Sequence, residues 1–255
     1  MNEFQKEQDV AIAIAKEAGK IMLEYFDADQ QVETKADNTF VTVADKKINS
    51  LVIQRLEAAF PKDGIIGEEE SNAEYGMGRR WVCDPIDGTH AFIYGLPSAM
   101  FSLGLVVDGV PILGVAYDPF LDKLYTGVKG GKSYCNQKEI SVSNLDLESG
   151  TLAVTSSVQS WAKKPHIQKL IDDKIRMASF SGAVLKSCLV ARGKFTGYLE
   201  AGINPHDLAA AHVIVECAGG KVTAMDGSAL DYSKPFKGAI ISNSVVHDKL
   251  VEYCK

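Results

Sequence analysis

The chain has few cysteines and no pattern among them. They are five in number and widely scattered, at Cys83, Cys135, Cys188, Cys217 and Cys254. No C-x-x-C pair and no spacing typical of a disulfide framework occurs. A zinc site and a disulfide-stapled secreted domain are therefore not expected, and we expect reduced thiols in a cytoplasmic protein.

Long apolar runs and an excess of positive charge are also missing. No stretch approaches the roughly 20 apolar residues of a membrane span, and the start of the chain lacks the basic and apolar regions of a signal peptide. The net charge of −6 argues against non-specific binding to nucleic acid or anionic membranes. No G-x-G-x-x-G opens a helix after a strand, which argues against a dinucleotide-binding oxidoreductase. We expect neither a nucleic-acid partner nor a membrane partner.

What is present is the composition of a folded protein. The 255 residues are 46% hydrophobic and 24% charged, enough for one large domain or two packed halves. Helical periodicity predicts a helix near residues 10–25 and a second one following Asp45. Beyond them, Met100–Val107 and Val110–Tyr117 read as strands joined by an Asp108-Gly109 hairpin turn.

After about Thr151 the pattern alternates between strands and helices. We therefore predict an α+β protein, a layered α-β-α-β-α sandwich. Residues 1–150 are expected to form an α+β half with an antiparallel sheet and most of the metal ligands. Residues 151–255 are expected to form a mixed α/β half, with one active site between the halves.

The densest chemical feature is the hexapeptide DPIDGT at residues 84–89. It follows a buried strand pattern and brings Asp84, Asp87 and the Ile86 carbonyl into one short segment. Hard cations such as Mg²⁺ bind sets of oxygen ligands of this kind. Without the rest of the chain, the two aspartates could equally form an Asx turn around Pro85.

Two further carboxylate sources lie far away in the sequence. Glu68 and Glu69 belong to an acidic run after Ile65-Ile66, which alone would be a solvated turn. Asp207 opens a predicted helix, where an aspartate is most often a cap. Their joint occurrence with DPIDGT favours a two-metal phosphoryl-transfer site.

Three segments together resemble the inositol monophosphatase family of metal-dependent, lithium-sensitive phosphatases. They are GEEE, WVCDPIDGTHAFIYGLP and GINPHDLAAAHVIVECAGG. The resemblance runs over nearly the whole chain, and its order and spacing are specific. It implies a magnesium-dependent phosphatase of small-molecule phosphate monoesters, with two or three Mg²⁺ ions per site and a homodimeric assembly.

The family pattern also implies roles for single residues. It assigns metal binding to the carboxylates and carbonyl of Glu68, Asp84, Ile86, Asp87 and Asp207.

The same pattern assigns catalysis to Thr89, which orients and deprotonates the attacking water, and to Asp87. Asp45, before its helix, is expected to hydrogen-bond Thr89, and Glu69 to act on Thr89 indirectly. The backbone N–H groups of Gly88 and Thr89 would meet the phosphate. Lys35 lies near a basic position of the family.

Substrate binding is implied for the second half of the chain. Ala183 matches a position that touches the substrate ring and Glu200 one that accepts polyol hydroxyls, and Asp207 is expected to contact the substrate as well as the metal. The chain departs from the family pattern at His90, at His206 in place of a tryptophan, and at Ala211 in place of a glycine. For Lys186, a phosphate contact and a simple helix-surface role are about equally favoured.

These observations imply in-line attack of a metal-activated water on phosphorus, without a phosphorylated residue. An inositol monophosphate is the leading substrate and histidinol phosphate the runner-up. Fructose 1,6-bisphosphate and 3′-phosphoadenosine 5′-phosphate are lower-ranked candidate substrates. A catalytically silent binding subunit is the non-enzymatic alternative, although no metal carboxylate of the family pattern is lost.

Overall fold

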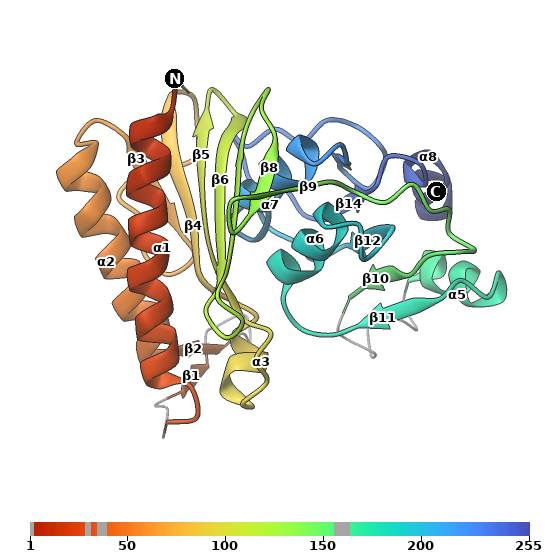
Figure 1. Ribbon diagram of the computed structural model, residues 1–255, viewed down its shortest axis with the longest axis horizontal. Coiled ribbons are helices and arrows are strands. Elements are labelled where there is room, and N and C mark those ends of the chain that lie inside the picture. The colour runs from red at the N-terminus through yellow and green to blue at the C-terminus, as the bar shows by residue number, and fades with distance from the viewer. Residues whose placement is uncertain (1–2, 29–31, 35–39, 156–163) are drawn as a thin grey trace.

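Two β-sheets, each covered by helices on both faces, organise the chain (Figure 1). The computed structural model describes residues 3–28, 32–34, 40–155 and 164–255. The helices are α1 (Gln5–Tyr25), α2 (Val43–Ala59), α3 (Thr89–Ile93), α5 (Pro165–Asp172), α6 (Ala183–Ala191), α7 (Pro205–Cys217) and α8 (His247–Cys254). From one side to the other, the layers are α1 and α2, the larger sheet, α6 and α7, the smaller sheet, and α5 and α8. The predicted α-β-α-β-α sandwich is confirmed.

The larger sheet has seven strands in the order β3-β4-β5-β6-β7-β8-β9. They are β3 (Gly64–Gly67), β4 (Arg79–Asp87), β5 (Met100–Val107), β6 (Val110–Asp118), β7 (Lys123–Val128), β8 (Ser133–Cys135) and β9 (Lys138–Ile140). All neighbours pair antiparallel except β3 and β4, which are parallel. The antiparallel sheet expected for the first half therefore carries one parallel edge strand.

The smaller sheet has five strands in the order β11-β10-β12-β14-β13. They are β10 (Leu152–Val154), β11 (Met177–Ser179), β12 (Gly197–Glu200), β13 (Lys221–Thr223) and β14 (Ala239–Ser242). The first three in this order are parallel, and β14 and β13 add antiparallel pairs. Two short strands outside both sheets, β1 (Val32–Thr34) and β2 (Phe40–Thr42), pair with each other. The mixed α/β pattern of the second half is thus present.

Helix α2 starts earlier than the sequence pattern indicated. Thr42 is its N-cap and Val43 its first residue, so Asp45 lies inside the first turn instead of before the helix. Thr42 Oγ1 accepts from the Asp45 N–H, and the Asp45 carboxylate accepts from the Thr42 N–H, which forms a capping box. The helix then buries Ile48, Val52 and Leu56 against the sheet.

Helix α7 lies unusually close to the sheet. Gly104, Gly114 and Gly127 face one another across β5, β6 and β7, and α7 packs over this row. A Cβ atom on Gly114 would lie 2.1 Å from the carbonyl oxygen of Ala210. Because only glycine leaves room for this contact, the row of glycines sets the position of α7 and of its N-terminal residues.

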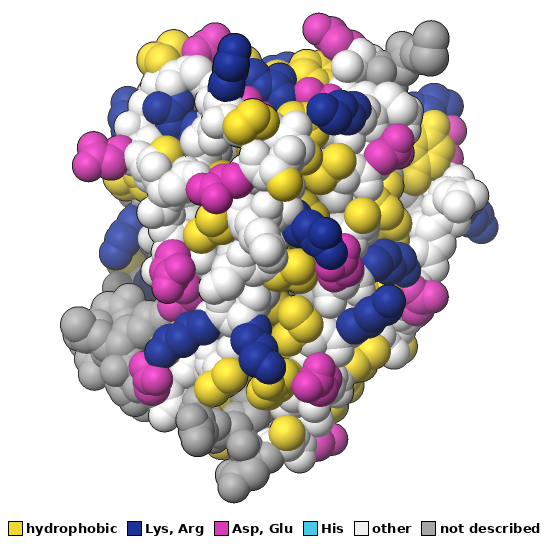
Figure 2. Space-filling view, turned by 90° about the vertical axis from the view of Figure 1, so that its left-hand side faces the viewer, with side chains coloured by type: hydrophobic (Ala, Val, Ile, Leu, Met, Phe, Trp, Pro, Cys, Tyr) yellow, Lys and Arg dark blue, Asp and Glu magenta, His cyan; other side chains and the backbone are white. Residues whose placement is uncertain are grey.

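The outer face of the first layer shows no field of a single charge sign. Figure 2 shows lysine and arginine side chains alternating with carboxylates on this side of the molecule. Ion pairs on α1 and α2 include Arg55 with Glu17 at 2.8 Å and Lys46 with Glu33 of β1 at 2.7 Å. Among the described residues, no helix combines the length and the apolar character that crossing a membrane requires.

Candidate active site

A cleft of about 400 Å³ opens where β4, α3, α6, β12 and α7 meet. Its lining includes residues from both sheets. The predicted site residues in the lining are Glu68, Asp84, Ile86, Asp87, Gly88, Thr89, Ala183, Glu200 and Asp207. Predicted Asp45 and Glu69 are not part of this lining, and Lys35 lies outside the described residues. The cleft therefore brings together most of the residues singled out from the sequence.

Asp84 and Asp87 face the same point because β4 is irregular between them. Asp84 pairs with Ser102 and Asp87 with Met100, so three steps along β4 match two steps along β5. This extra residue is a bulge, and it turns two side chains to one side that a regular strand would point to opposite faces. Pro85, within the bulge, has no N–H to leave unpaired.

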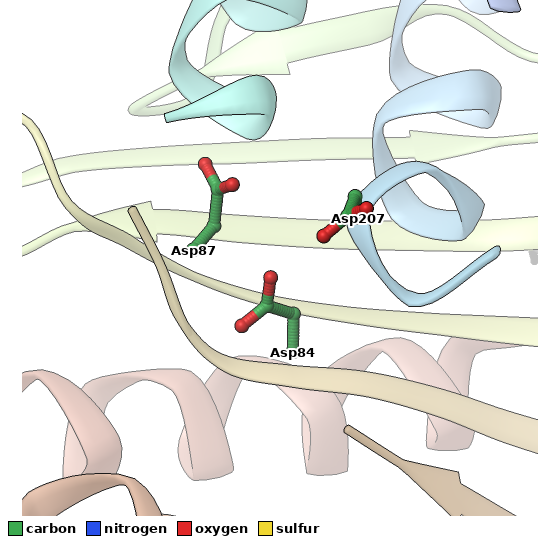
Figure 3. Close-up of side chains that lie close together, drawn as sticks. All are labelled: Asp84, Asp87 and Asp207. Carbon is green, nitrogen blue, oxygen red and sulfur yellow. The ribbon is translucent and has the colours of Figure 1, made fainter. Parts of the chain in front are cut away.

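Asp207 reaches the two aspartates from α7. Figure 3 shows the three carboxylates grouped in one place, and each contributes an oxygen within 4.8 Å of the others. Asp207 is the third residue of α7, where its Oδ2 accepts the Asn204 N–H at 2.6 Å. The helix starts earlier than the sequence indicated, with Asn204 as its N-cap, so Asp207 accepts a backbone N–H as expected but from inside the first turn instead of from the cap position.

Asp87 ties the first half of the chain to the second. Its Oδ1 accepts from the Ala183 N–H at 2.8 Å, and its Oδ2 from the Val184 N–H at 2.7 Å. Both donors belong to the first turn of α6, where N–H groups have no partner within the helix. Ala183, expected to touch the substrate, thus also positions a carboxylate.

Gly88 and Thr89 form the turn that follows β4. Gly88 has a φ of +87°, a backbone conformation that favours glycine. A Cβ there would also lie 3.2 Å from Gly182 Cα. Thr89 is the first residue of α3, and its Oγ1 donates to the Ile86 carbonyl at 3.0 Å.

The expected hydrogen bond between Asp45 and Thr89 is not formed. Thr89 donates to Ile86 instead, while Asp45 Oδ2 accepts from Thr42 N at 2.7 Å and from Thr42 Oγ1 at 2.6 Å. Asp45 lies inside the first turn of α2, and its carboxylate turns back to the residue that caps the helix. Glu69 still lies near enough to Asp45 to contribute to the raised pKa of that residue.

The site concentrates negative charge in a buried place. Burial, together with repulsion from Glu68 and Asp87, raises the pKa of Asp84 well above its usual value. Burial also raises the pKa values of Asp45, Asp87 and Asp207 to about 7. Ionising several of these groups together is costly unless a cation is present.

Two buried carboxylate oxygens have no hydrogen-bond partner among the described residues, Asp45 Oδ1 and Asp84 Oδ1. A buried acceptor without a partner costs free energy, on the order of 1–3 kcal/mol. A cation at the three-aspartate cluster would compensate Asp84, and all the available ligands there are oxygens, which hard divalent cations prefer. The residues therefore fit a metal site.

Residues that the sequence did not assign to the site also lie at the cleft. Phe40 and Tyr198 line it, and Lys164 forms an ion pair with Glu200 at 3.6 Å. His90 lines the rim, with its ring 6.0 Å from that of Phe40. No local pattern joins Lys164 to Glu200, so the sequence offers no signal for this contact.

His206 and Lys186, whose roles the sequence left open, are both placed near carboxylates. His206 Nε2 lies 3.5 Å from Asp207 Oδ1. Lys186 is only 2% exposed, so it is not a helix-surface lysine. Its Nζ lies 4.3 Å from the centroid of the Tyr198 ring.

The sequence pattern of the inositol monophosphatase family matches residues 3–255. The chain belongs to this family. It is 34% identical over 252 residues to a histidinol-phosphatase of Mycobacterium tuberculosis, with 95% of each chain covered. It is 35% identical over 236 residues to inositol monophosphatase 1 of Solanum lycopersicum, with 87% of this chain and 85% of the other covered.

A solved structure of the same fold adds a metal to the comparison. It is described as an IMPase/NADP phosphatase complexed with NADP and Ca²⁺, and it is 26% identical to this chain with a TM-score of 0.87, covering 99% and 96% of the two chains. The inositol monophosphatase family is metal-dependent, and the acidic cluster of this member fits that property. As a member of the family, the chain is a phosphomonoesterase.

Proposed function

We propose that this inositol monophosphatase family member is a magnesium-dependent phosphatase of small polyol phosphates, with an inositol monophosphate as its leading substrate. The observation that carries the proposal is the cluster of Asp84, Asp87 and Asp207, with oxygens within 4.8 Å of one another beside a cleft of about 400 Å³. A cleft of that volume accommodates a small ester.

The proposed metal ligands are the carboxylates of the cluster, Glu68 and the Ile86 carbonyl. When two or three Mg²⁺ ions are bound there, they supply Lewis acidity and lower the pKa of water. The Ile86 oxygen accepts from Thr89 Oγ1 and keeps a second lone pair for a cation. Asp84 Oδ1, which has no partner among the described groups, is available in the same way.

The proposed reaction is an in-line displacement in which no side chain becomes phosphorylated. In this reaction Thr89 Oγ1 would orient the attacking water, and the backbone N–H groups of Gly88 and Thr89 would hold the phosphate. Asp45 and Glu69 would act behind Thr89 by electrostatics. Asp87 is fixed by two N–H donors of α6. It would keep the part of the cleft that holds the phosphate aligned with the part that holds the alcohol.

The alcohol part of the substrate is proposed to contact Ala183 and Glu200, next to Asp207. A carboxylate at this place favours hydroxyl-bearing alcohols, because an apolar group would leave it without a donor. Histidinol phosphate is the second candidate. The rings of Phe40 and His90 at the cleft offer flat surfaces for an imidazole, and a relative carries that activity in its name.

We also propose that residues 1–150 and 151–255 act as two halves around this one site, in a cytoplasmic homodimer without nucleic-acid or membrane partners. All five cysteines are free thiols, which supports a reducing compartment. Sedimentation equilibrium of the purified protein tests the dimer, and a monomer at micromolar concentration contradicts it.

Phosphate release by purified protein tests the function, with Mg²⁺ or with EDTA. The panel is inositol 1-phosphate, histidinol phosphate, fructose 1,6-bisphosphate and 3′-phosphoadenosine 5′-phosphate. We expect release that depends on Mg²⁺, with the highest kcat/KM for inositol 1-phosphate. Equal release in EDTA contradicts the magnesium site, and a higher kcat/KM for histidinol phosphate makes the second candidate the function.

A further inference from the structure

The Glu200 carboxylate, at the substrate end of the cleft, has donors on both of its oxygens. Oε1 accepts the Gly202 N–H at 3.1 Å and lies 3.6 Å from Lys164 Nζ. Oε2 accepts from the Tyr198 hydroxyl at 3.5 Å. The side chains of Lys164 and Glu200 are only 20% and 14% exposed. Solvent therefore screens this ion pair less than it screens a pair on the surface.

A second lysine, the buried Lys186, acts on the same carboxylate through its charge. Lys186 Nζ lies over the Tyr198 ring and 3.4 Å from the Val154 carbonyl oxygen. Burial lowers the pKa of Lys186, and Glu200 is the foremost of the carboxylates that oppose this shift. Glu200 is thus subject to the charges of two lysines, Lys164 at ion-pair distance and Lys186 further away, although the cleft as a whole is rich in carboxylates.

Lys164 is held in place by its neighbours in the chain. It is the N-cap of α5, with an extended backbone (φ −120°, ψ 99°), and Pro165 follows it as the first helical residue. A proline disfavours helical backbone in the residue before it, which keeps Lys164 extended. Helix α5 is anchored by Ile167 and Leu170, both buried. The backbone that carries Lys164 is therefore fixed by the helix that follows it.

We propose that Lys164 is a specificity-determining residue, which occupies Glu200 and thereby disfavours phosphate esters whose alcohol carries an ammonium group. A substrate hydroxyl can still donate to Glu200, because a carboxylate offers about four acceptor positions. A substrate ammonium must displace Lys164 or stay beside two lysines, and both cost free energy. The inference rests on the proposed function, since it concerns the alcohol part of the same ester.

The test compares kcat/KM for histidinol phosphate, which carries an ammonium group, with kcat/KM for inositol 1-phosphate, which does not. In Lys164→Met the ratio of the two should shift about tenfold towards histidinol phosphate, which corresponds to roughly 1.4 kcal/mol. We expect the shift mainly in KM for histidinol phosphate, since Lys164 acts on binding of the alcohol. Lys164→Arg keeps the charge and should keep the ratio within about twofold.

Lys169→Met is the matched control, because Lys169 is an exposed lysine of the same helix. It should leave the ratio unchanged. If Lys164→Met does not fold, as judged by its thermal unfolding, Lys164→Gln gives the same readout. If the wild-type enzyme is active and Lys164→Met leaves the ratio of the two kcat/KM values unchanged, this inference is overturned and the proposed function stands. Wild-type protein that releases no phosphate from either ester overturns the proposed function and this inference with it.

Discussion

Helices α2 and α7 lie on opposite faces of the seven-stranded sheet, and both contact β4 (Figure 1). Each begins with the same local arrangement, a capping box whose third helical residue is an aspartate. Asp45 accepts the Thr42 N–H at 2.7 Å, and Asp207 accepts the Asn204 N–H at 2.6 Å. Burial raises the pKa of both aspartates to about 7.

The two aspartates differ in what surrounds them. Asp207 lies within 4.8 Å of Asp84 and Asp87 and lines the cleft. Asp45 does not line it, and its Oδ1 has no hydrogen-bond partner in the described part of the chain. The same sequence motif fixes the orientation of both carboxylates, while the packing of the helix decides what each can reach. We therefore expect Asp207 to bind metal and Asp45 to act through other residues.

The largest effect is expected for Asp207→Asn. The amide oxygen can still accept the Asn204 N–H, so the start of α7 is kept while the charge is lost. Metal coordination supplies several kcal/mol of transition-state stabilisation, which corresponds to a loss in kcat/KM of about a thousandfold or more. Steady-state kinetics measures this loss, and calorimetric titration of Mg²⁺ should show weaker binding.

Asp207 is preferred over Asp87 for this test because both Asp87 oxygens accept N–H groups of α6. In Asp87→Asn the new NH₂ group would face one of those N–H donors and lose that hydrogen bond. A loss of activity in that variant could then come from altered folding as well as from altered catalysis. Near-normal turnover and Mg²⁺ affinity in Asp207→Asn would contradict the metal-ligand role.

Next in size is the pH dependence of the metal-free protein. The pKa values of Asp45, Asp87 and Asp207 are about 7 in the folded protein and about 3.9 in an unfolded chain. The folded state then binds more protons between these values, so its stability falls as the pH rises from about 4 through 7. The total loss of stability over this range is on the order of several kcal/mol, and each kcal/mol lowers the Tm by about 2–4 °C.

Melting curves from pH 5 to 8, in EDTA and in Mg²⁺, measure this dependence. Mg²⁺ binds the ionised carboxylates of the cluster, so the Tm should fall less steeply in Mg²⁺ than in EDTA across this range. His247, whose pKa burial lowers to about 4, acts in the opposite direction below about pH 6.5. Because His247 and Asp45 act in both media, the difference between the two curves isolates the carboxylates of the cluster. Parallel curves would mean that no cation binds there.

The close packing of α7 predicts a third effect, which α2 lacks. In Gly114→Ala the new methyl group would lie 2.1 Å from the Ala210 carbonyl oxygen. Pushing α7 away should cost about 3 kcal/mol of stability, at the upper end for overpacking, and should lower activity by moving Asp207. Gly127→Ala is the matched control, since its nearest contact is 3.2 Å. Equal melting temperatures for the two variants would contradict this account.

Much of the site could be predicted because its signals are local in the sequence. DPIDGT places two carboxylates and a carbonyl within six residues, and the motif before α7 carries its own helix signal, Asn204 followed by Pro205. The start of α2 could also have been found. Thr42 and Asp45 match the spacing of a capping box, with aspartate in place of the usual glutamate.

Other features depend on contacts between distant segments and leave no local pattern. The bonds from α6 to Asp87 join residues 96 and 97 apart. The ion pair of Lys164 and Glu200 joins the start of α5 to the end of β12, which only the fold brings together. The bulge between Asp84 and Asp87 is set by pairing with β5, so Pro85 alone could not reveal it.

The smallest effect is expected for Asp45→Asn. Its amide oxygen can accept from Thr42 as the carboxylate does, and its NH₂ then takes the place of the oxygen that has no partner. Asp45 makes no hydrogen bond to the cluster and would act on it through its charge, and residues outside the ligand set typically contribute about 10–100-fold. We therefore expect kcat to fall by about that factor, with Mg²⁺ affinity nearly unchanged, and the metal-free protein to become more stable because a buried carboxylate is removed.

Thr42→Ala separates the capping role of this pair from its catalytic role. It removes the side-chain cap of α2 and should cost about 1 kcal/mol of stability, while Asp45 keeps its charge and kcat changes little. If Asp45→Asn lost as much activity and Mg²⁺ affinity as Asp207→Asn, Asp45 would be a metal ligand and the contrast between the two helices would disappear. If both α2 variants were fully active, the aspartate of α2 would serve only its helix. The expected result is an intermediate loss of activity in Asp45→Asn and none in Thr42→Ala. It would mean that activity requires the charge of Asp45 but not the cap of α2, which assigns Asp45 to positioning.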